Sequence, residues 1–226
     1  MHIIEIFRSI QGESTQAGLP CTFVRLAGCN LRCHWCDSAY TFTGGGKMTV
    51  DEVTAEVRRL AAAGLVEITG GEPMLQEKEV LELMQRLLTL GYDLMLETSG
   101  ERPLGKVPRE VVKIVDVKCP DSGEGGTFHM KNLEALTPRD EIKMVISTRA
   151  DYEFAREFTR QYGLETEVAA VLFSPAFRKD AGPARDSDNC LLDPRQLTEW
   201  ILADHLNVRM SLQMHKFIWP PATKGV

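Results

Sequence analysis

The chain has 226 residues, with 43% hydrophobic and 26% charged side chains and a formal net charge of −6 at pH 7. These values are ordinary for one globular domain spanning residues 1–226, and the negative balance argues against a broad surface that tracks nucleic-acid phosphates. No apolar stretch approaches the roughly 20 residues needed to span a bilayer, and residues 1–8 lack the pattern of a secretory signal. We therefore expect a cytoplasmic protein that binds neither nucleic acid nor membrane.

Segments with strand and helix character alternate along the chain. The predicted strands are residues 20–27, 66–69, 93–97, 111–117, 141–146, 168–173 and 208–214, and the predicted helices are residues 49–63, 76–90, 151–162 and 193–206. This alternation is typical of a parallel sheet with right-handed crossovers. The predicted fold is therefore α/β, a shortened β/α barrel of about six parallel strands in a single domain.

Three loops interrupt this alternation, at residues 44–46, 122–127 and 176–189. The first is rich in glycine, and we expect it to be flexible. Long loops in a compact domain act as lids or binding segments or are disordered. Of the other two, residues 122–127 are the better candidate for binding.

Three cysteines within eight residues form the most informative motif. Cys29, Cys33 and Cys36 follow the spacing Cys-x3-Cys-x2-Cys directly after the first predicted strand. Disulfides use cysteines in pairs, and a structural zinc site closes four ligands around the metal. Three thiolates instead suit a cubane iron–sulfur cluster whose fourth iron stays open to another ligand. The other three cysteines stand singly, which favours a reducing compartment.

The cysteine spacing resembles the signature of the radical S-adenosylmethionine superfamily, and so does the segment from Gly70 to Pro73, which reads Gly-Gly-Glu-Pro. In that superfamily three cysteines hold a 4Fe-4S cluster, and the open iron binds S-adenosylmethionine. One electron then cleaves this cofactor to a 5′-deoxyadenosyl radical that abstracts hydrogen from the substrate. The resemblance therefore implies both the cluster and S-adenosylmethionine as cofactors.

Further blocks resemble the 7-carboxy-7-deazaguanine synthase family. They are residues 7–14, 23–31, 36–38, 69–73, 97–100 and 212–216, whereas residues 121–200 match only loosely. The resemblance implies a lyase of queuosine and 7-deazapurine biosynthesis that converts 6-carboxy-5,6,7,8-tetrahydropterin to 7-carboxy-7-deazaguanine with loss of ammonia. It further implies Mg²⁺, a reductant such as flavodoxin or ferredoxin, and a homodimer.

Site residues follow from this resemblance position by position. Cys29, Cys33 and Cys36 match the cluster ligands, and Ser38 matches the hydroxyl that meets magnesium, where many members carry threonine. The expected contacts to S-adenosylmethionine are Trp35, Asp37, Gly71, Thr98, Ser99, Asp116, Val117 and Lys118. The expected contacts to the pterin are Ile10, Gln11, Gly12, Glu13, Arg25, Thr69, Ser174 and Pro175. Turn formation is an alternative role for Ser38, Thr98 and Ser99, and loop packing for Trp35.

The chemistry of three of these residues suits a pterin. An amide and an acid, Gln11 and Glu13, complement its donor–acceptor edge, and Arg25 could bind its carboxylate in a bidentate way. Arg25 lies on a strand between apolar neighbours. Without a ligand it would be an unpaired charge turned toward the core, or else a surface arginine on an exposed strand face.

Two other functions stay open at the level of sequence. A glycyl-radical activating enzyme shares the cysteine triplet and the short barrel, but it often has extra ferredoxin-type cysteines that this chain lacks. A zinc-binding module without catalysis would need only the cysteine loop, where we expect His34 to face solvent and to bind no metal. His215 and Lys216 resemble the end of the family's chains, yet this sequence continues to residue 226, which leaves the role of its tail in doubt.

Overall fold

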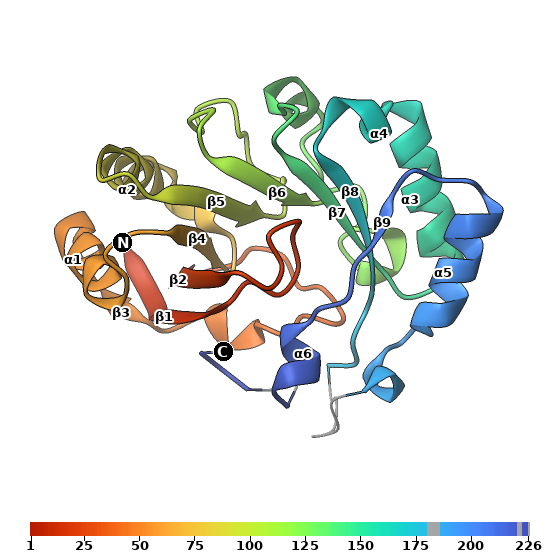
Figure 1. Ribbon diagram of the computed structural model, residues 1–226, viewed down its shortest axis with the longest axis horizontal. Helices are drawn as coiled ribbons and strands as arrows, with labels where there is room; N and C mark the ends of the chain where they lie inside the picture. Colours follow the sequence, from red (N-terminus) through yellow and green to blue (C-terminus); the bar gives the residue numbers. More distant parts are fainter. Residues whose placement is uncertain (180–185, 221–222, 226) are drawn as a thin grey trace.

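The computed structural model describes residues 1–179, 186–220 and 223–225. One curved, open sheet of nine strands forms its centre, in the order β3-β1-β2-β4-β5-β6-β7-β8-β9 (Figure 1). The strands are β1 (His2–Ile10), β2 (Pro20–Leu26), β3 (Gly46–Lys47), β4 (Leu65–Gly70), β5 (Asp93–Thr98), β6 (Val112–Asp116), β7 (Glu141–Ile146), β8 (Ala170–Pro175) and β9 (Arg209–Met210).

The α-helices are α1 (Val50–Leu60), α2 (Glu77–Thr89), α3 (Arg149–Gln161), α4 (Leu164–Glu167), α5 (Pro194–Ala203) and α6 (His215–Ile218). Short 3-10 helices are η1 (Ala39–Thr41), η2 (Pro73–Gln76), η3 (Pro120–Ser122), η4 (Met130–Ala135) and η5 (Ser187–Asn189). Helix α1 covers the outside of the sheet near β1 and β2, and α2 covers it near β5; α3 packs near β7, α4 near β8, and α5 near β8 and β9 (Figure 1).

The strands from β2 and β4 through β9 are mutually parallel, which confirms the predicted partial β/α barrel. The prediction was wrong about the first strand. β1 precedes β2 and pairs with it antiparallel, and β3 pairs antiparallel with β1, so a hairpin extends one edge of the sheet. The last predicted strand, 208–214, is reduced to the two residues of β9.

Part of the glycine-rich loop at residues 44–46 belongs to the sheet. Gly46 belongs to β3 and pairs with Ile3 of β1. Gly45 has a positive φ of 79°, and a side-chain carbon there would lie 2.6 Å from the carbonyl oxygen of Ile3. Glycine is therefore the residue that permits this close strand approach. Of the loop predicted at 176–189, residues 180–185 lie outside the described part of the chain, as do 221–222 and 226 of the tail.

Alternation along the parallel strands separates the apolar core from the concave face. Outward positions pack beneath the helices, among them Val66, Ile68, Leu94 and Leu96, which are 2% exposed or less. The intervening inward positions are largely polar. The polar ones are Arg25, Glu67, Thr69, Glu97, Asp116 and Lys143, beside the apolar Phe23, Ile114 and Val145. A strand with both faces buried would normally be apolar throughout, so this polar concave face marks the functional side of the sheet.

Side-chain caps begin two of the long helices. Thr49 and Glu52 form a reciprocal capping box at the start of α1, and the Thr148 hydroxyl accepts a hydrogen bond from the Asp151 amide at the start of α3. None of the described helices has the length and apolar character that crossing a bilayer requires.

A buried ion pair stabilises the start of β6. The Lys113 ammonium lies 2.8 Å from the Asp140 carboxylate, and the two side chains are 1% and 0% exposed. Asp140 also accepts hydrogen bonds from the backbone amides of Lys113 and Thr137. The pair therefore links the start of β6 to the turn before β7.

Replacing Asp140 by alanine should lower the free energy of unfolding by about 3–5 kcal/mol, because the Lys113 charge would be buried without a partner. Urea unfolding of Asp140→Ala beside the wild type measures this difference. Asp140→Asn, which keeps the shape and an acceptor oxygen for one of the two backbone amides, is the comparison for the charge. A loss below about 1 kcal/mol for the alanine variant, the level of an exposed pair, would contradict the structural role.

Candidate active site

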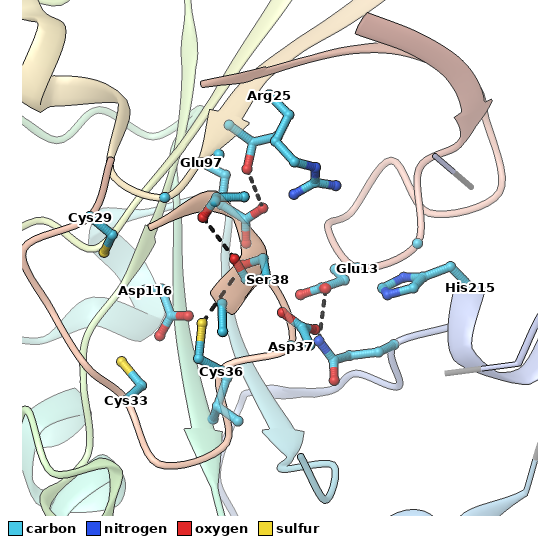
Figure 2. Close-up of a pocket in the computed structure, with 18 of the residues that line it drawn as sticks. Glu13, Arg25, Cys29, Cys33, Cys36, Asp37, Ser38, Glu97, Asp116 and His215 are labelled. Atoms are coloured by element: carbon cyan, nitrogen blue, oxygen red, sulfur yellow. Dashed lines mark hydrogen bonds between the residues drawn. The ribbon is translucent and has the colours of Figure 1, made fainter. Parts of the chain in front are cut away.

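A pocket of about 440 Å³ lies at the concave face and the carboxyl ends of the parallel strands. Such strand ends are where α/β folds place their ligands. Cys29, Cys33 and Cys36 lie on one side of this pocket, and Glu13 and His215 lie on the other (Figure 2). The cysteine triplet and the residues expected to bind the pterin, which lie in separate segments of the sequence, thus line one cavity.

The cysteine loop is held at several points by backbone hydrogen bonds. The Gly28 amide donates to the Thr41 carbonyl at 2.7 Å, and the Glu72 amide donates to the Gly28 carbonyl at 2.8 Å. Farther along, the His34 amide donates to the Ser122 carbonyl at 2.9 Å. The loop is therefore anchored to the segments that follow β4 and β6.

His34 is exposed, as predicted, and its ring packs against the segment that begins at Ser122. Its Nδ1 atom lies 2.9 Å from the carbonyl oxygen of Asp121. A side-chain carbon at Gly123 would lie 2.7 Å from the ring. The predicted binding loop at 122–127 lies outside the pocket lining and instead supports the cysteine loop.

All three thiols are free, half-buried and part of the pocket lining. Burial raises the pKa of Cys33 to about 11, although the nearby Lys118 ammonium opposes this shift. In the described part of the chain, no three His, Cys, Asp or Glu side chains are grouped to hold a single metal ion. A cubane makes a different demand, because each thiolate binds its own iron. Three thiols on one anchored loop fit such a cluster, whose iron would replace the thiol protons.

Gly71 brings the Gly-Gly-Glu-Pro segment against the cysteine loop. A side-chain carbon at this position would lie 2.1 Å from the carbonyl oxygen of Gly28 and 2.8 Å from Cys29 Cβ. Any other residue would force the two segments apart. The two motifs that the sequence paired by resemblance are therefore in direct backbone contact.

Glu72 joins the ends of β4 and β5, a role that sequence reasoning missed. Its fully buried carboxylate accepts hydrogen bonds from the Met74 amide, the Thr98 hydroxyl, and the amide and hydroxyl of Ser99, at 2.7–2.9 Å. The hydroxyls of Thr98 and Ser99 are thus directed to Glu72, although both residues line the pocket. This contact corresponds to the turn-forming role that the sequence left open for them.

Asp116 and Lys118 form the base of the pocket near Cys33. The Lys118 ammonium lies 2.9 Å from Asp116 Oδ2, while Asp116 Oδ1 is buried without a hydrogen bond to a described residue. Val117, between them, packs into the hydrophobic core and not into the pocket. Only its backbone is left to contact a cofactor.

Ser38, Asp37 and Trp35 line the pocket beside the cysteines. The Ser38 hydroxyl lies 3.8 Å from Cys36 Sγ. Asp37 forms an ion pair with Lys216 at 2.6 Å. Loss of hydration would raise the pKa of Asp37, but the Lys216 ammonium outweighs it and holds that pKa well below its usual range.

The opposite side of the pocket centres on Glu13. Its carboxylate lies 2.7 Å from the Lys143 ammonium and accepts a hydrogen bond from the Gln213 amide at 2.8 Å. Burial alone would raise the pKa of Glu13, but Lys143 and then His215 outweigh it and lower that pKa to about 2. Glu13 is therefore an ionised acceptor at neutral pH.

Gln11 is buried, and its amide is fully engaged within the protein. Its side-chain nitrogen donates to the Glu67 carboxyl group, and its side-chain oxygen accepts a hydrogen bond from the backbone amide of Glu13 at 2.6 Å. Burial, together with the nearby Glu97 and Glu13, raises the pKa of Glu67 well above its ordinary value. Glu67, beneath Gln11, is thus harder to ionise than an ordinary glutamate.

Arg25 has a protein partner that the sequence did not reveal. Its Nε atom lies 2.9 Å from Glu5 Oε1, and the Tyr40 hydroxyl donates to the same oxygen at 2.7 Å. The guanidinium also lies 5.5 Å from the centre of the Phe7 ring. Glu5 and Phe7 belong to β1, so the unpredicted strand pairs the arginine expected to lack a partner.

The segment before and within α6 forms the remaining wall. The Met214 amide donates to the Gly12 carbonyl at 2.8 Å, and a side-chain carbon at Gly12 would lie 2.3 Å from His215 Nδ1. Burial lowers the pKa of His215. Glycine at position 12 thus lets the last helix lie directly on the loop after β1.

Most predicted contacts are therefore gathered in one cavity, and a few are not. Ile10, Thr69 and the other predicted contacts line it, except Val117 in the core and Ser174 and Pro175 within β8. Sequence reasoning missed Glu67, Glu97, Lys143 and Gln213. Charged residues inside otherwise apolar strands, such as Lys143 in β7, were the available signal.

Comparison with known proteins shows which proteins the chain resembles. The radical SAM superfamily model matches residues 24–120. The chain is 66% identical to a 7-carboxy-7-deazaguanine synthase of Koribacter versatilis, with both chains fully covered, and 40% identical to one of Chlorobaculum tepidum, covering 100% of this chain and 97% of the relative. Its structure resembles the crystal structure of QueE from Escherichia coli with a TM-score of 0.74 and 25% identity, over 95% of this chain and 94% of that one.

Cys33→Ala should give a folded protein that lacks the visible absorption of an iron–sulfur cluster, because one of three ligands is lost. Circular dichroism and the iron content after anaerobic reconstitution measure the two properties. Cys190→Ala, which removes a buried thiol outside the pocket lining, is the control and should retain the colour. Full iron content in the Cys33 variant would refute the ligand assignment.

Glu67→Gln should become more stable relative to the wild type as pH rises from about 5 to 8, by roughly 1 kcal/mol or more. The raised pKa means that folded Glu67 keeps a proton that the unfolded chain releases, so its contribution is greatest at low pH and is lost as pH rises. Glutamine does not titrate. Urea unfolding at both pH values tests this, and an identical pH dependence of the two proteins would contradict it.

Proposed function

Because the chain belongs to the 7-carboxy-7-deazaguanine synthase family of radical S-adenosylmethionine enzymes, we propose that it converts 6-carboxy-5,6,7,8-tetrahydropterin to 7-carboxy-7-deazaguanine with loss of ammonia. It is a lyase of queuosine and related 7-deazapurine biosynthesis. The observation that carries this function is the single pocket lined by both the cysteine triplet and the Glu13 site. Residues 1–226 act as one radical S-adenosylmethionine domain.

Cys29, Cys33 and Cys36 would hold the 4Fe-4S cluster, and its open iron supplies one-electron reductive cleavage of S-adenosylmethionine when both are bound. The polar groups nearest these thiols support S-adenosylmethionine binding on the same side. The proposed contacts are Trp35, Asp37, Gly71, Thr98, Ser99, Asp116, Lys118 and the Val117 backbone. Gly71 keeps its backbone open to the cavity because a side chain has no room there.

Mg²⁺ is proposed to bind beside Ser38, whose hydroxyl oxygen lines the pocket next to Cys36. A hard oxygen ligand suits magnesium, which usually keeps several waters and takes further oxygens from the substrate. The substrate carboxylate is such a source of oxygens. The ion would thus bind where the cofactor side and the substrate side of the pocket meet.

The pterin is proposed to bind at the opposite side of the pocket. Ionised Glu13 accepts hydrogen bonds from its N–H edge, and Arg25, fixed through Glu5, binds the carboxylate. Thr69 and the loop from Ile10 to Gly12 complete the lining. Because Gln11 uses its amide to hold Glu67 and the Glu13 backbone, it supports this site from beneath.

An electron-transfer protein such as flavodoxin or ferredoxin is the proposed reductant, and two copies of the chain are proposed to associate. Cytoplasmic localisation is proposed as well. The free cysteines support it, since a reducing compartment keeps thiolates available for iron.

The test is anaerobic reconstitution with iron and sulfide, followed by dithionite, S-adenosylmethionine, Mg²⁺ and 6-carboxytetrahydropterin. We expect 7-carboxy-7-deazaguanine, identified by mass. Cleavage to 5′-deoxyadenosine without this product would reject the substrate, and no cleavage by an intact reduced cluster would reject the enzyme class.

Arg25→Ala should weaken pterin binding roughly tenfold or more, because a charge-assisted contact is lost, while cleavage of S-adenosylmethionine without substrate continues. Arg195→Ala, at an exposed position of α5, is the matched control. Loss of the cluster in the Arg25 variant would show that the residue is structural.

A further inference from the structure

Lys143 lies at the centre of an acidic cluster that spans the pocket. Its side chain, on β7, is only 5% exposed. It forms ion pairs with Glu13 at 2.7 Å, with Glu97, and with Asp116 at 3.6 Å. These carboxylates come from the loop after β1, from β5 and from β6, so one ammonium joins three separate parts of the fold.

Around Lys143, carboxylate groups outnumber ammonium groups among the described residues. Lys118 also neutralises Asp116, but Glu13 and Glu97 have Lys143 as their shared ion-pair partner among the described residues. Removing a cation from such a buried group leaves carboxylates that repel one another at low dielectric. They would then separate, take up protons or admit water.

The carboxylates are further fixed by neutral donors. Glu97 accepts a hydrogen bond from the Thr69 hydroxyl at 3.3 Å, and Glu13 accepts one from the Gln213 amide at 2.8 Å. Each is therefore held on two sides, by Lys143 and by a polar neighbour. These contacts use both oxygens of each carboxylate and fix its orientation, so a ligand in the pocket would donate to the lone pairs that remain on these oxygens.

Figure 2 shows that the partners of Lys143 occupy different regions of the site. Asp116 lies near Cys33 and Cys36, whereas Glu13 lies near His215 on the opposite side. Strand register brings Asp116 and Lys143 side by side as direct partners of β6 and β7. Lys143 thus connects the cofactor side of the pocket to the substrate side through one buried charge.

We propose that Lys143 is a positioning residue that holds Glu13 and Glu97 as acceptors for the N–H donor edge of the substrate and fixes them relative to Asp116. The inference rests on the proposed function, because it assigns the partner of these carboxylates as the pterin. Lys143 acts through the carboxylates, since they surround its ammonium. The carboxylates of Glu13 and Glu97 would accept hydrogen bonds from the N–H groups of the pterin. A ligand that presents only acceptor atoms to them would be repelled, so these contacts favour the pterin.

The test compares Lys143→Met with Lys113→Met in the reconstituted enzyme. Lys113 is also buried and ion-paired, but it lies outside the pocket lining, so its variant controls for loss of a buried charge. Equilibrium binding of 6-carboxytetrahydropterin and the iron content after reconstitution are measured for both. We expect Lys143→Met to bind the pterin at least roughly tenfold more weakly than Lys113→Met at the same iron content. Binding of equal strength would overturn the inference.

A second pair of variants covers the case in which Lys143→Met fails to fold. Glu97→Gln removes one carboxylate charge, and the double variant Lys143→Met with Glu97→Gln then carries less uncompensated charge. The double variant should still bind the pterin more weakly than Glu97→Gln alone, because Glu13 loses its ion-pair partner. Equal binding by these two proteins would also overturn the inference. Failure of the wild type to bind the pterin would instead reject the proposed function.

Discussion

Mutual neutralisation of charges on the concave face is the constraint on which the rest of the site depends. Four neighbouring strands, β4 to β7, each direct an ionisable side chain inward: Glu67, Glu97, Asp116 and Lys143. A parallel sheet normally buries both faces in apolar contacts, so each of these groups must find a partner or lose its charge. Burial and the neighbouring Glu97 and Glu13 make ionisation of Glu67 costly, and its pKa is accordingly raised well above the ordinary value. The polar face is thus a coupled system.

The cofactor side depends on backbone contacts instead of charge. Gly71 touches the Gly28 carbonyl, and Glu72 ties the ends of β4 and β5 together with four hydrogen bonds. The Gly28 carbonyl also accepts a hydrogen bond from the Glu72 backbone amide. The position of the cysteine loop is therefore fixed by the segment that follows β4. A loop that must offer three thiols to one cluster gains from such fixed support, since its ligands cannot drift independently.

Local sequence patterns predicted the features that depend on short-range spacing. Sequence alone identified three such features: the cysteine triplet, the glycines at 70 and 71, and the strand–helix alternation. β1 was missed because its charged and polar residues, including Glu5 and Arg8, leave only a partly buried strand. Its absence from the prediction also hid the partner of Arg25. Lys143 gained meaning only through register, which sets it beside Asp116 and brings Glu13 to it from 130 residues away.

Segments near both ends of the sequence meet at the pocket, where Gly12 lies against His215 and the Glu13 carboxylate receives Gln213. During synthesis the ribosome releases residues 213–216 long after the cysteine loop and the strands that carry the acidic groups. The cysteine loop can therefore form while one wall of the cavity is still missing. Enclosure of the site is a late event in folding, and the cavity cannot exclude solvent from bound ligands until that last wall has docked.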